Sequence, residues 1–164
     1  MKKRIVCVLF ALMIIFNIVA CTEESVDDNG ESSAYTLDYQ SQTIKIDGEA
    51  NAIIAALGTP QLYEELPTCG KGDLDKLYQF GSIRIRTYQI NGRDYFSVIE
   101  IMDDLIKTRE GVAIGDTQDA VQNAYGEADE KTVGAWTYYA KGMDLEVYFN
   151  DSNLVKSIVY RGKN

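Results

Sequence analysis

Hydrophobic and polar residues alternate in short runs along most of the chain after residue 34. Alternation with a period of two is typical of strands that bury one face. We expect strands at residues 34–39, 42–46, 77–80, 83–90, 95–102, 135–140, 143–149 and 154–160. Pairs of turn-forming residues between them predict tight hairpins, at Gln40-Ser41, Gly81-Ser82, Asn91-Gly92 and Lys141-Gly142. Residues 63–71 show no such pattern and are expected to be irregular, whereas 105–106 is expected to be a short bridging strand.

Two short segments have apolar residues at helical spacing instead. We expect helices at residues 49–57 and 117–125. Gly58 and Gly126 follow them directly, and glycine favours the end of a helix because it tolerates a positive φ. Asp47 and Asp116 are expected to cap the two helix starts.

The second helical segment and the strands after it resemble a copy of the first. At a shift of 68 positions, Ile46, Ala52, Ile53, Ala56 and Gly58 fall on Ile114, Ala120, Val121, Ala124 and Gly126. At a shift of 60, Tyr78, Tyr88, Ser97, Val98 and Ile99 fall on Tyr138, Tyr148, Ser157, Ile158 and Val159. The expected fold class is therefore α+β: a tandem duplication of a helix plus three or more antiparallel strands, forming one sheet or a pseudo-symmetric pair. The first repeat would span residues 34–102 and the second 103–164.

The amino terminus has the pattern of a secretory signal. Lys2, Lys3 and Arg4 precede an apolar run over residues 5–20 that is short for a membrane span. This predicts a signal peptide at residues 1–20. The alternatives are an ordinary secretory signal cleaved nearby, or an uncleaved anchor.

The sequence Ile18-Val19-Ala20-Cys21 resembles a bacterial lipobox. The resemblance implies that Cys21 becomes the mature first residue and carries acyl chains such as palmitate, which would hold the protein on the outer side of the cell membrane. Residues 21–33 are polar and carry five carboxylates, so they predict a disordered acidic tether after the lipidated cysteine.

Charge and composition exclude several functions. The formal net charge is −9, and removal of residues 1–20, which carry Lys2, Lys3 and Arg4 and no acids, takes it to −12. Phosphate backbones repel a protein this acidic, so no nucleic acid is expected as a partner. The chain has no histidine, which excludes Ser-His-Asp and Cys-His catalysis and removes the commonest zinc ligand. We therefore expect a non-enzyme without a cofactor.

Acidic clusters leave two alternatives open. Asn150-Asp151-Ser152-Asn153 and Asp73-Leu74-Asp75 could hold calcium, but neither has the spacing of a calcium loop, and turn chemistry explains both, so no metal is predicted. Glycosidases use paired carboxylates. Candidates here are Asp73, Asp75, Glu100, Asp103 and Asp104, although their spacing does not distinguish them from a solvated acidic surface.

Cys69 is the one cysteine expected to keep a free thiol, since Cys7 leaves with the signal and Cys21 is acylated. It could be a reactive thiol beside Lys71. A small packing side chain is the favoured interpretation, because no histidine is present to lower its pKa.

Several short motifs resemble known families. The segment Gly111-Val112-Ala113-Ile114-Gly115-Asp116-Thr117, with Val121 and Tyr125-Gly126, is similar to the repeat of the beta-lactamase-inhibitor-protein-like folds and related small outer-membrane lipoproteins. The mature chain also resembles a group of uncharacterised bacterial lipoproteins at Pro67-Thr68-Cys69, Asp75-Lys76-Leu77-Tyr78 and Thr108-Arg109-Glu110-Gly111. The resemblance implies helices packed on antiparallel strands, with the tandem pair making a concave sheet. It does not supply the inhibitory loops.

The expected function is that of a non-catalytic binding or scaffolding module in the cell envelope. Aromatic side chains on the strands could grip a protein, peptide or glycan. The residues expected to form this binding surface are Tyr78, Tyr88, Trp136, Tyr138, Tyr139 and Tyr148. The alternative, which follows from the resemblance, is an inhibitor or modulator of an envelope enzyme.

Overall fold

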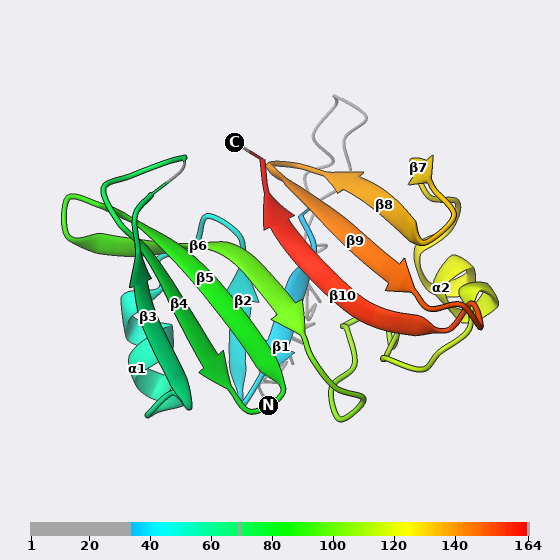
Figure 1. Ribbon diagram of the computed structural model, residues 1–164, viewed down its shortest axis with the longest axis horizontal. Coiled ribbons are helices and arrows are strands. Elements are labelled where there is room, and N and C mark those ends of the chain that lie inside the picture. The colour runs from blue at the N-terminus through cyan, green and yellow to red at the C-terminus, as the bar shows by residue number, and fades with distance from the viewer. Residues whose placement is uncertain (1–33, 69, 164) are drawn as a thin grey trace, which may run out of the picture.

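The computed structural model describes residues 34–68 and 70–163 (Figure 1). The predicted signal peptide, Cys21, the acidic tether and Cys69 lie outside the described residues. The elements, in chain order, are β1 (Thr36–Tyr39), β2 (Gln42–Lys45), α1 (Asn51–Leu57), β3 (Leu62–Leu66), β4 (Asp75–Phe80), β5 (Ile83–Ile90), β6 (Arg93–Ile101), α2 (Gln118–Tyr125), β7 (Glu130–Lys131), β8 (Ala135–Ala140), β9 (Met143–Phe149) and β10 (Val155–Gly162).

An eight-stranded sheet with the order β3-β4-β5-β6-β10-β9-β8-β7 dominates the molecule. Every neighbouring pair in it is antiparallel. The strands of each half are joined by hairpins, and β6 meets β10 at the centre, where Ile101 lies opposite Ile158. The fold is therefore mixed α+β, with much more sheet than helix, because only two short helices accompany the strands.

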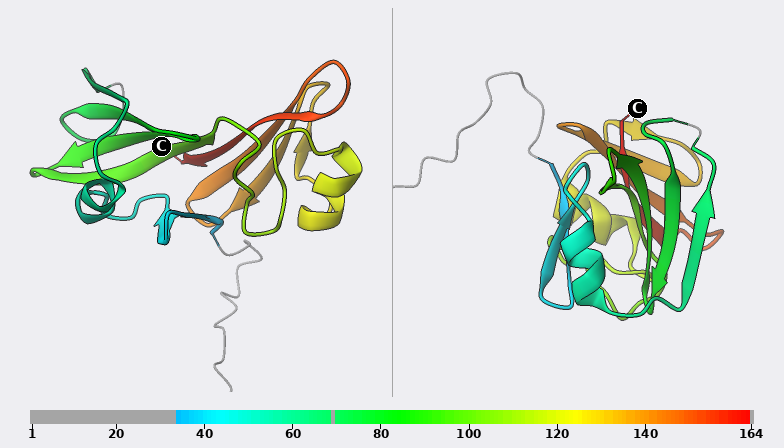
Figure 2. Two further views of the ribbon diagram at one scale, coloured as in Figure 1. Left: turned by 90° about the horizontal axis from the view of Figure 1, so that it is seen from below. Right: turned by 90° about the vertical axis from the view of Figure 1, so that its left-hand side faces the viewer.

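Both helices and the β1–β2 hairpin cover the same face of the large sheet (Figure 2). Strand alternation sends the apolar residues of β5, β6, β9 and β10 to this covered face, where burial of apolar area stabilises the fold. The fully buried side chains with the largest volumes are Tyr138, Tyr160, Phe96, Leu37, Ile44, Ile83, Ile85, Ile99, Ile101, Met143, Leu145 and Ile158.

The β1–β2 hairpin contacts β4 in the first half of the sheet and the segment that precedes α2. Leu37 and Ile44 face each other across the hairpin, and both are 0% exposed. Its Tyr39 hydroxyl donates to the Phe80 carbonyl of β4 at 2.8 Å. On the other side, Arg109 donates to both carboxylate oxygens of Asp38 at 2.9–3.1 Å. The hairpin thus links the segment before α2 to the first half.

The predicted hairpins and helices are confirmed, with small shifts at their ends. Asn91 and Gly92 both have positive φ, as a two-residue hairpin turn with the right twist requires. Gly58 and Gly126 end the two helices with φ of 86° and 80°. No helix in the described part of the chain is long and apolar enough to cross a membrane.

Two edge strands, β3 and β7, were not predicted, and β3 overlaps residues 63–71, which were expected to be irregular. β3 and β7 each have a single neighbour and mostly exposed side chains, so they need no apolar alternation. No strand forms at residues 105–106, where the backbone turns toward a bridge between Lys107 and Ala113.

The helix caps differ from the prediction as well. The N-cap of α1 is Ala50, without a side-chain bond, and the N-cap of α2 is Thr117, whose hydroxyl accepts from the Ala120 amide. Asp47 instead accepts from the Tyr88 hydroxyl, and Asp116 accepts from the Ala113 amide. Asp47 is thus engaged by a tertiary contact and Asp116 by the loop before α2, so neither carboxylate caps its helix.

Candidate functional site

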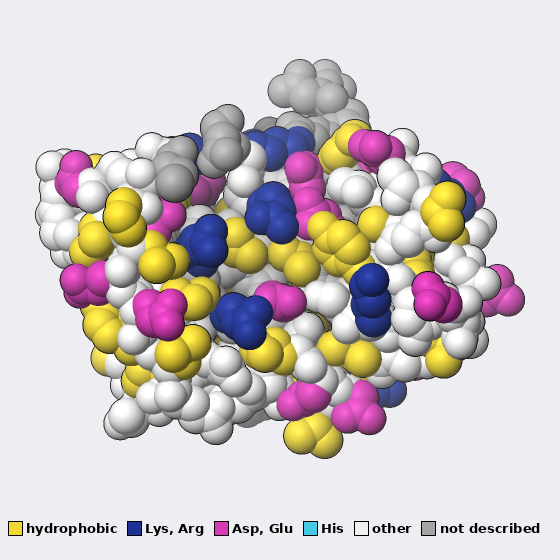
Figure 3. Space-filling view, viewed as in Figure 1, with side chains coloured by type: hydrophobic (Ala, Val, Ile, Leu, Met, Phe, Trp, Pro, Cys, Tyr) yellow, Lys and Arg dark blue, Asp and Glu magenta, His cyan; other side chains and the backbone are white. Residues whose placement is uncertain are grey.

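The face of the sheet opposite the helices is open, and Figure 3 shows basic and apolar side chains grouped near its middle. The alternation in β5 explains how this face acquires its charge. Ile83 and Ile85 are 0% exposed on the covered face, so Arg84 and Arg86, which alternate with them, point to the open face.

A groove of about 540 Å³ crosses this open face over the junction of β6 and β10. Its lining comes from six strands: Leu62, Leu77, Arg84, Arg86, Val98, Glu100, Tyr148, Ser157, Val159 and Arg161. The register shifts between Arg86 and Thr87 in the β5–β6 pair, and between Val155 and Ser157 in the β9–β10 pair. Such bulges bend a strand and increase its twist. We refer to this feature as the central groove.

Two of the three arginines in the central groove are already paired. Arg84 donates to Glu100 at 3.0 Å, and the Ser157 hydroxyl lies 3.4 Å from the second oxygen of that carboxylate. Arg161 binds both oxygens of Glu146, at 3.0 and 3.2 Å. These pairs neutralise the positive charge on either side of the groove.

The Glu146 carboxylate is held in its ionised form. Partial burial acts to raise its pKa, but hydrogen bonds from Arg161 and from the Tyr148 hydroxyl outweigh that effect and lower the pKa below the ordinary value. The bidentate guanidinium geometry also fixes the orientation of Arg161.

Arg86 is the unpaired cation of the groove. Its partners across the sheet are Leu77 on β4 and Val98 on β6, so no carboxylate lies directly opposite it. Within the described residues its guanidinium makes no hydrogen bond or ion pair, and the side chain is exposed. The two aliphatic neighbours flank the stem of the arginine and leave its donors free for a ligand.

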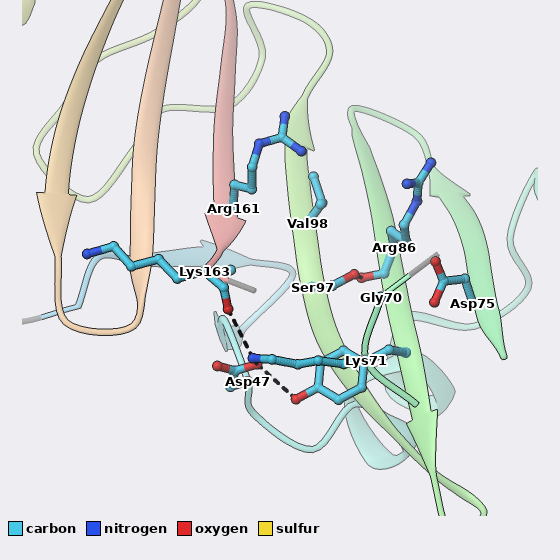
Figure 4. Close-up of a pocket in the computed structure, with 11 residues that line it drawn as sticks. Asp47, Gly70, Lys71, Asp75, Arg86, Ser97, Val98, Arg161 and Lys163 are labelled. Carbon is cyan, nitrogen blue, oxygen red and sulfur yellow. Dashed lines mark hydrogen bonds and ion pairs between the residues drawn. The ribbon is translucent and has the colours of Figure 1, made fainter. Parts of the chain in front are cut away.

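A smaller pocket of about 170 Å³ adjoins the groove at one end and shares Arg86, Val98 and Arg161 with it (Figure 4). The contacts of Lys71 reduce its free donors. The ammonium donates to the Lys163 carbonyl at 3.0 Å, which a dashed line in Figure 4 marks, and it lies 3.8 Å from Asp47. It also lies 5.8 Å from the centre of the Tyr88 ring.

Tyr88 forms one wall of that smaller pocket. Burial, together with its hydrogen bond to Asp47 at 2.8 Å, raises the pKa of Tyr88 to about 12. The hydroxyl therefore stays protonated at neutral pH, as a donor to the Asp47 carboxylate.

The six aromatic residues predicted as one binding surface are separated by the sheet. Tyr78, Trp136 and Tyr138 are 7%, 8% and 1% exposed and belong to the core, because they sit at covered-face positions of β4 and β8. They are not available to a ligand in this structure.

The other three aromatic residues lie at accessible or pocket-lining positions. Tyr148 lines the central groove and Tyr88 the smaller pocket. Tyr139 is 43% exposed, and its hydroxyl donates to Glu130 at 2.8 Å. Of the six residues, only Tyr148 borders the central groove.

The predicted acidic candidates are dispersed. Glu100 lies in the groove against Arg84, and Asp75 lines the smaller pocket. Asp103 accepts from the Leu105 amide in a turn, and no group of three Cys, Asp or Glu in the described ranges could hold a metal ion. In the turn at residues 150–153, the Asn150 side chain accepts hydrogen bonds from the amides of Ser152 and Leu154, which is the turn chemistry expected there.

None of the three arginines of the groove was predicted as a site residue. A signal for two of them was present in Ile83-Arg84-Ile85-Arg86, where strict alternation separates an apolar face from a basic one. Arg161 and Val159 had no comparable local signal. Their place beside Arg86 depends on the pairing of β10 with β6.

Comparison with known proteins adds little to this geometry. No family model matches the chain, and no curated protein matches it. Among solved structures, the chain is similar to a DUF4309 family protein (YjgB) from Bacillus subtilis subsp. subtilis str. 168. The two are 17% identical, the alignment covers 77% of this chain and 85% of that chain, and the TM-score is 0.44. A likeness of this size does not carry a function to this chain.

Proposed function

We propose that the chain is a non-catalytic binding module, anchored to the outside of the cell membrane by acyl chains on Cys21, that recognises its partner on the open face of the sheet. The observation that carries this proposal is the central groove, which combines an apolar floor with an unpaired arginine. Ligand sites are typically concave and mostly apolar, with a few well-placed polar groups.

The placement of the open face supports the proposal. The described chain begins beside β1, on the side of the sheet that carries the helices (Figure 2). A tether that attaches there leaves the opposite face directed away from the attachment point. On a membrane-anchored protein, such a face would be presented to the surroundings.

We also propose that the two halves of the sheet descend from one module. α1 precedes β3 to β6 in the chain, and α2 precedes β7 to β10, while the sheet order runs inward from each edge to the β6–β10 junction. The shift of 68 carries α1 onto α2, and the shift of 60 carries β4 and β5 onto β8 and β9. The groove would then lie where the two copies meet.

A photocrosslinking experiment in intact cells tests the binding proposal. A photoreactive phenylalanine analogue replaces Val98, which lines the groove, or Val133, which is 99% exposed and does not line it. We expect a discrete adduct from position 98 and not from the control. The same adducts from both positions, or none from position 98, would contradict a specific partner on this face.

The anchor has a separate test. Cells grown with an alkyne-tagged palmitate should label the wild-type chain, and Cys21→Ser should abolish the label and release the protein from the membrane fraction. Labelling that survives the substitution would place the acyl chains elsewhere. An unlabelled protein that stays in the membrane fraction would instead favour an uncleaved anchor.

A further inference from the structure

We propose that the occupant of the central groove is an acidic peptide segment, in which one carboxylate pairs with Arg86 while neighbouring aliphatic side chains cover Leu77, Val98 and Val159. This inference rests on the proposed binding function and adds the chemistry of the partner.

Charge complementarity is the first argument. The protein as a whole is strongly acidic, with a formal net charge of −9, yet the groove is lined by three arginines and a single glutamate. Arg84 and Arg161 are neutralised by Glu100 and Glu146. Arg86 therefore supplies the unmatched charge, and a guanidinium binds a carboxylate with two parallel hydrogen bonds.

The apolar floor is the second argument. Leu77 and Val98 lie directly across from Arg86 on the neighbouring strands, and Val159 lines the same groove. Aliphatic surface of this kind is stabilised by contact with apolar side chains of a ligand, which remove it from water. A peptide with an acidic residue between aliphatic ones matches both features.

Other ligand classes fit the lining less well. Tyr148 is the single aromatic residue among the residues that line the groove, whereas single-stranded nucleic acids need several rings on which bases stack. The acidic tether of this chain matches the groove less well too. It has the carboxylates, but Val26 is its single aliphatic residue between Glu23 and Glu31.

The test begins with a random peptide library displayed on phage and selected on the detergent-solubilised full chain. We expect enrichment of peptides with Asp or Glu beside Leu, Ile, Val or Phe. Binding of one enriched synthetic peptide is then measured to the wild type, Arg86→Gln, Arg86→Lys and Arg93→Gln. Arg93 is exposed at the start of β6 and outside the groove, so it is the matched control for the loss of one positive charge.

The expected pattern is specific to a carboxylate–guanidinium pair. Arg86→Gln should weaken binding by about tenfold or more, the range for a hydrogen-bonded charge. The affinity of Arg86→Lys should lie between those of the wild type and Arg86→Gln. Arg93→Gln should bind the peptide as tightly as the wild type does. A peptide with Gln in place of its Glu should bind the wild type more weakly by the same factor. Its affinity should not fall further with Arg86→Gln, because the two changes remove one and the same interaction. An unchanged urea midpoint for Arg86→Gln confirms that the variant is folded.

Several results would overturn the inference. They are enrichment of neutral or basic peptides, equal binding by Arg86→Gln, or stronger competition by inorganic phosphate than by acetate at equal concentration. A tenfold gain in affinity after the tether acids are changed to amides would identify the tether itself as the occupant. If no peptide is enriched, the inference fails, and crosslinking from position 98 in cells decides separately whether the binding function stands.

Discussion

At the scale of single residues, the open face is organised by which charges find a partner within the protein. Glu146 receives hydrogen bonds from Arg161 and Tyr148, and Glu100 receives one from Arg84. These contacts orient the arginines, and those to Glu146 lower the pKa of its carboxyl group below the ordinary value. Arg86 differs because hydrophobic residues stand at the corresponding cross-strand positions. The groove therefore has charges fixed by these pairs, with one guanidinium unmatched among the described residues.

Removal of the Arg161 guanidinium should raise the pKa of Glu146. The contact with Arg161 lowers the pKa of Glu146 in the folded state. Its contribution to the free energy of unfolding is therefore fully present above the ordinary glutamate pKa, and it is lost as the pH falls through the lowered value. A carbon-detected NMR titration of the Glu146 carboxyl group checks this in the wild type and Arg161→Gln. An equal or lower pKa in the variant would contradict the assigned cause.

Another ion pair, between Lys76 and Asp94, lies on the covered side. The Lys76 ammonium contacts both oxygens of Asp94 at 2.9 and 3.0 Å, and these side chains are 14% and 7% exposed. Gln89 donates to the same carboxylate, while the Asp94 amide donates to Asn51 of α1. The cluster fixes α1 against β5 and β6.

Asp94→Ala should therefore lower the free energy of unfolding by about 3–5 kcal/mol, because Lys76 is left as a buried charge without its partner. Urea denaturation followed by circular dichroism gives the value. Asp104→Ala, at an exposed turn position, is the control and should change stability by less than about 0.5 kcal/mol. A loss as small as that of the control would mean that Lys76 finds water or another acceptor.

At the scale of elements, the helices are short and depend on their ends and on packing. α2 has eight residues, from Gln118 to Tyr125, and it is held by the Thr117 cap and by the buried Val121. α1 has no side-chain cap and is held instead by the backbone bond from the Ala50 amide to the Asp94 carbonyl at 2.7 Å. Isolated helices of this length are not stable in water.

Thr117→Ala should lower the free energy of unfolding by about 1 kcal/mol, because it removes the acceptor for the Ala120 amide at the start of α2. Thermal or urea unfolding measures the change. Asn123→Ala, at an exposed position in the same helix, should not lower stability, since alanine has the higher helix propensity. Equal losses from both substitutions would show that the cap bond contributes nothing.

At the scale of the whole molecule, the two halves share one sheet and one covered face. β6 and β10 pair over four residues on each strand, and the β1–β2 hairpin contacts Phe80 on one side and Arg109 on the other. The buried residues of both halves belong to one hydrophobic cluster. We therefore expect the described part of the chain to unfold as one cooperative unit.

Ile85→Ala tests this cooperativity from the first half. Ile85 is 0% exposed on β5, so the substitution should cost about 2–5 kcal/mol through lost burial and the cavity left behind. Trp136, the single tryptophan of the chain, is buried on β8 in the second half and reports unfolding there by fluorescence. Its urea midpoint should fall together with the midpoint from circular dichroism. An unchanged fluorescence midpoint would show that the halves unfold independently.

Local features of the sequence determined the hairpins, the C-terminal ends of the helices and the division of each strand into two faces. Asn91-Gly92 forms its turn because both residues accept positive φ, and Ile83 and Ile85 separate from Arg84 and Arg86 because strand side chains alternate. Each of these properties depends on residues that are adjacent in the chain, so they can be predicted without the tertiary fold.

Only the tertiary structure decided which face of the sheet is covered, and therefore which residues can meet a ligand. Alternation alone does not say which aromatic residues are buried, so Tyr138 entered the core while Tyr148 came to border the groove. The groove itself exists because β6 pairs with β10, which brings Arg161 beside Val98. That pairing joins segments about sixty residues apart, and its stability comes from shared burial of both halves rather than from any local preference.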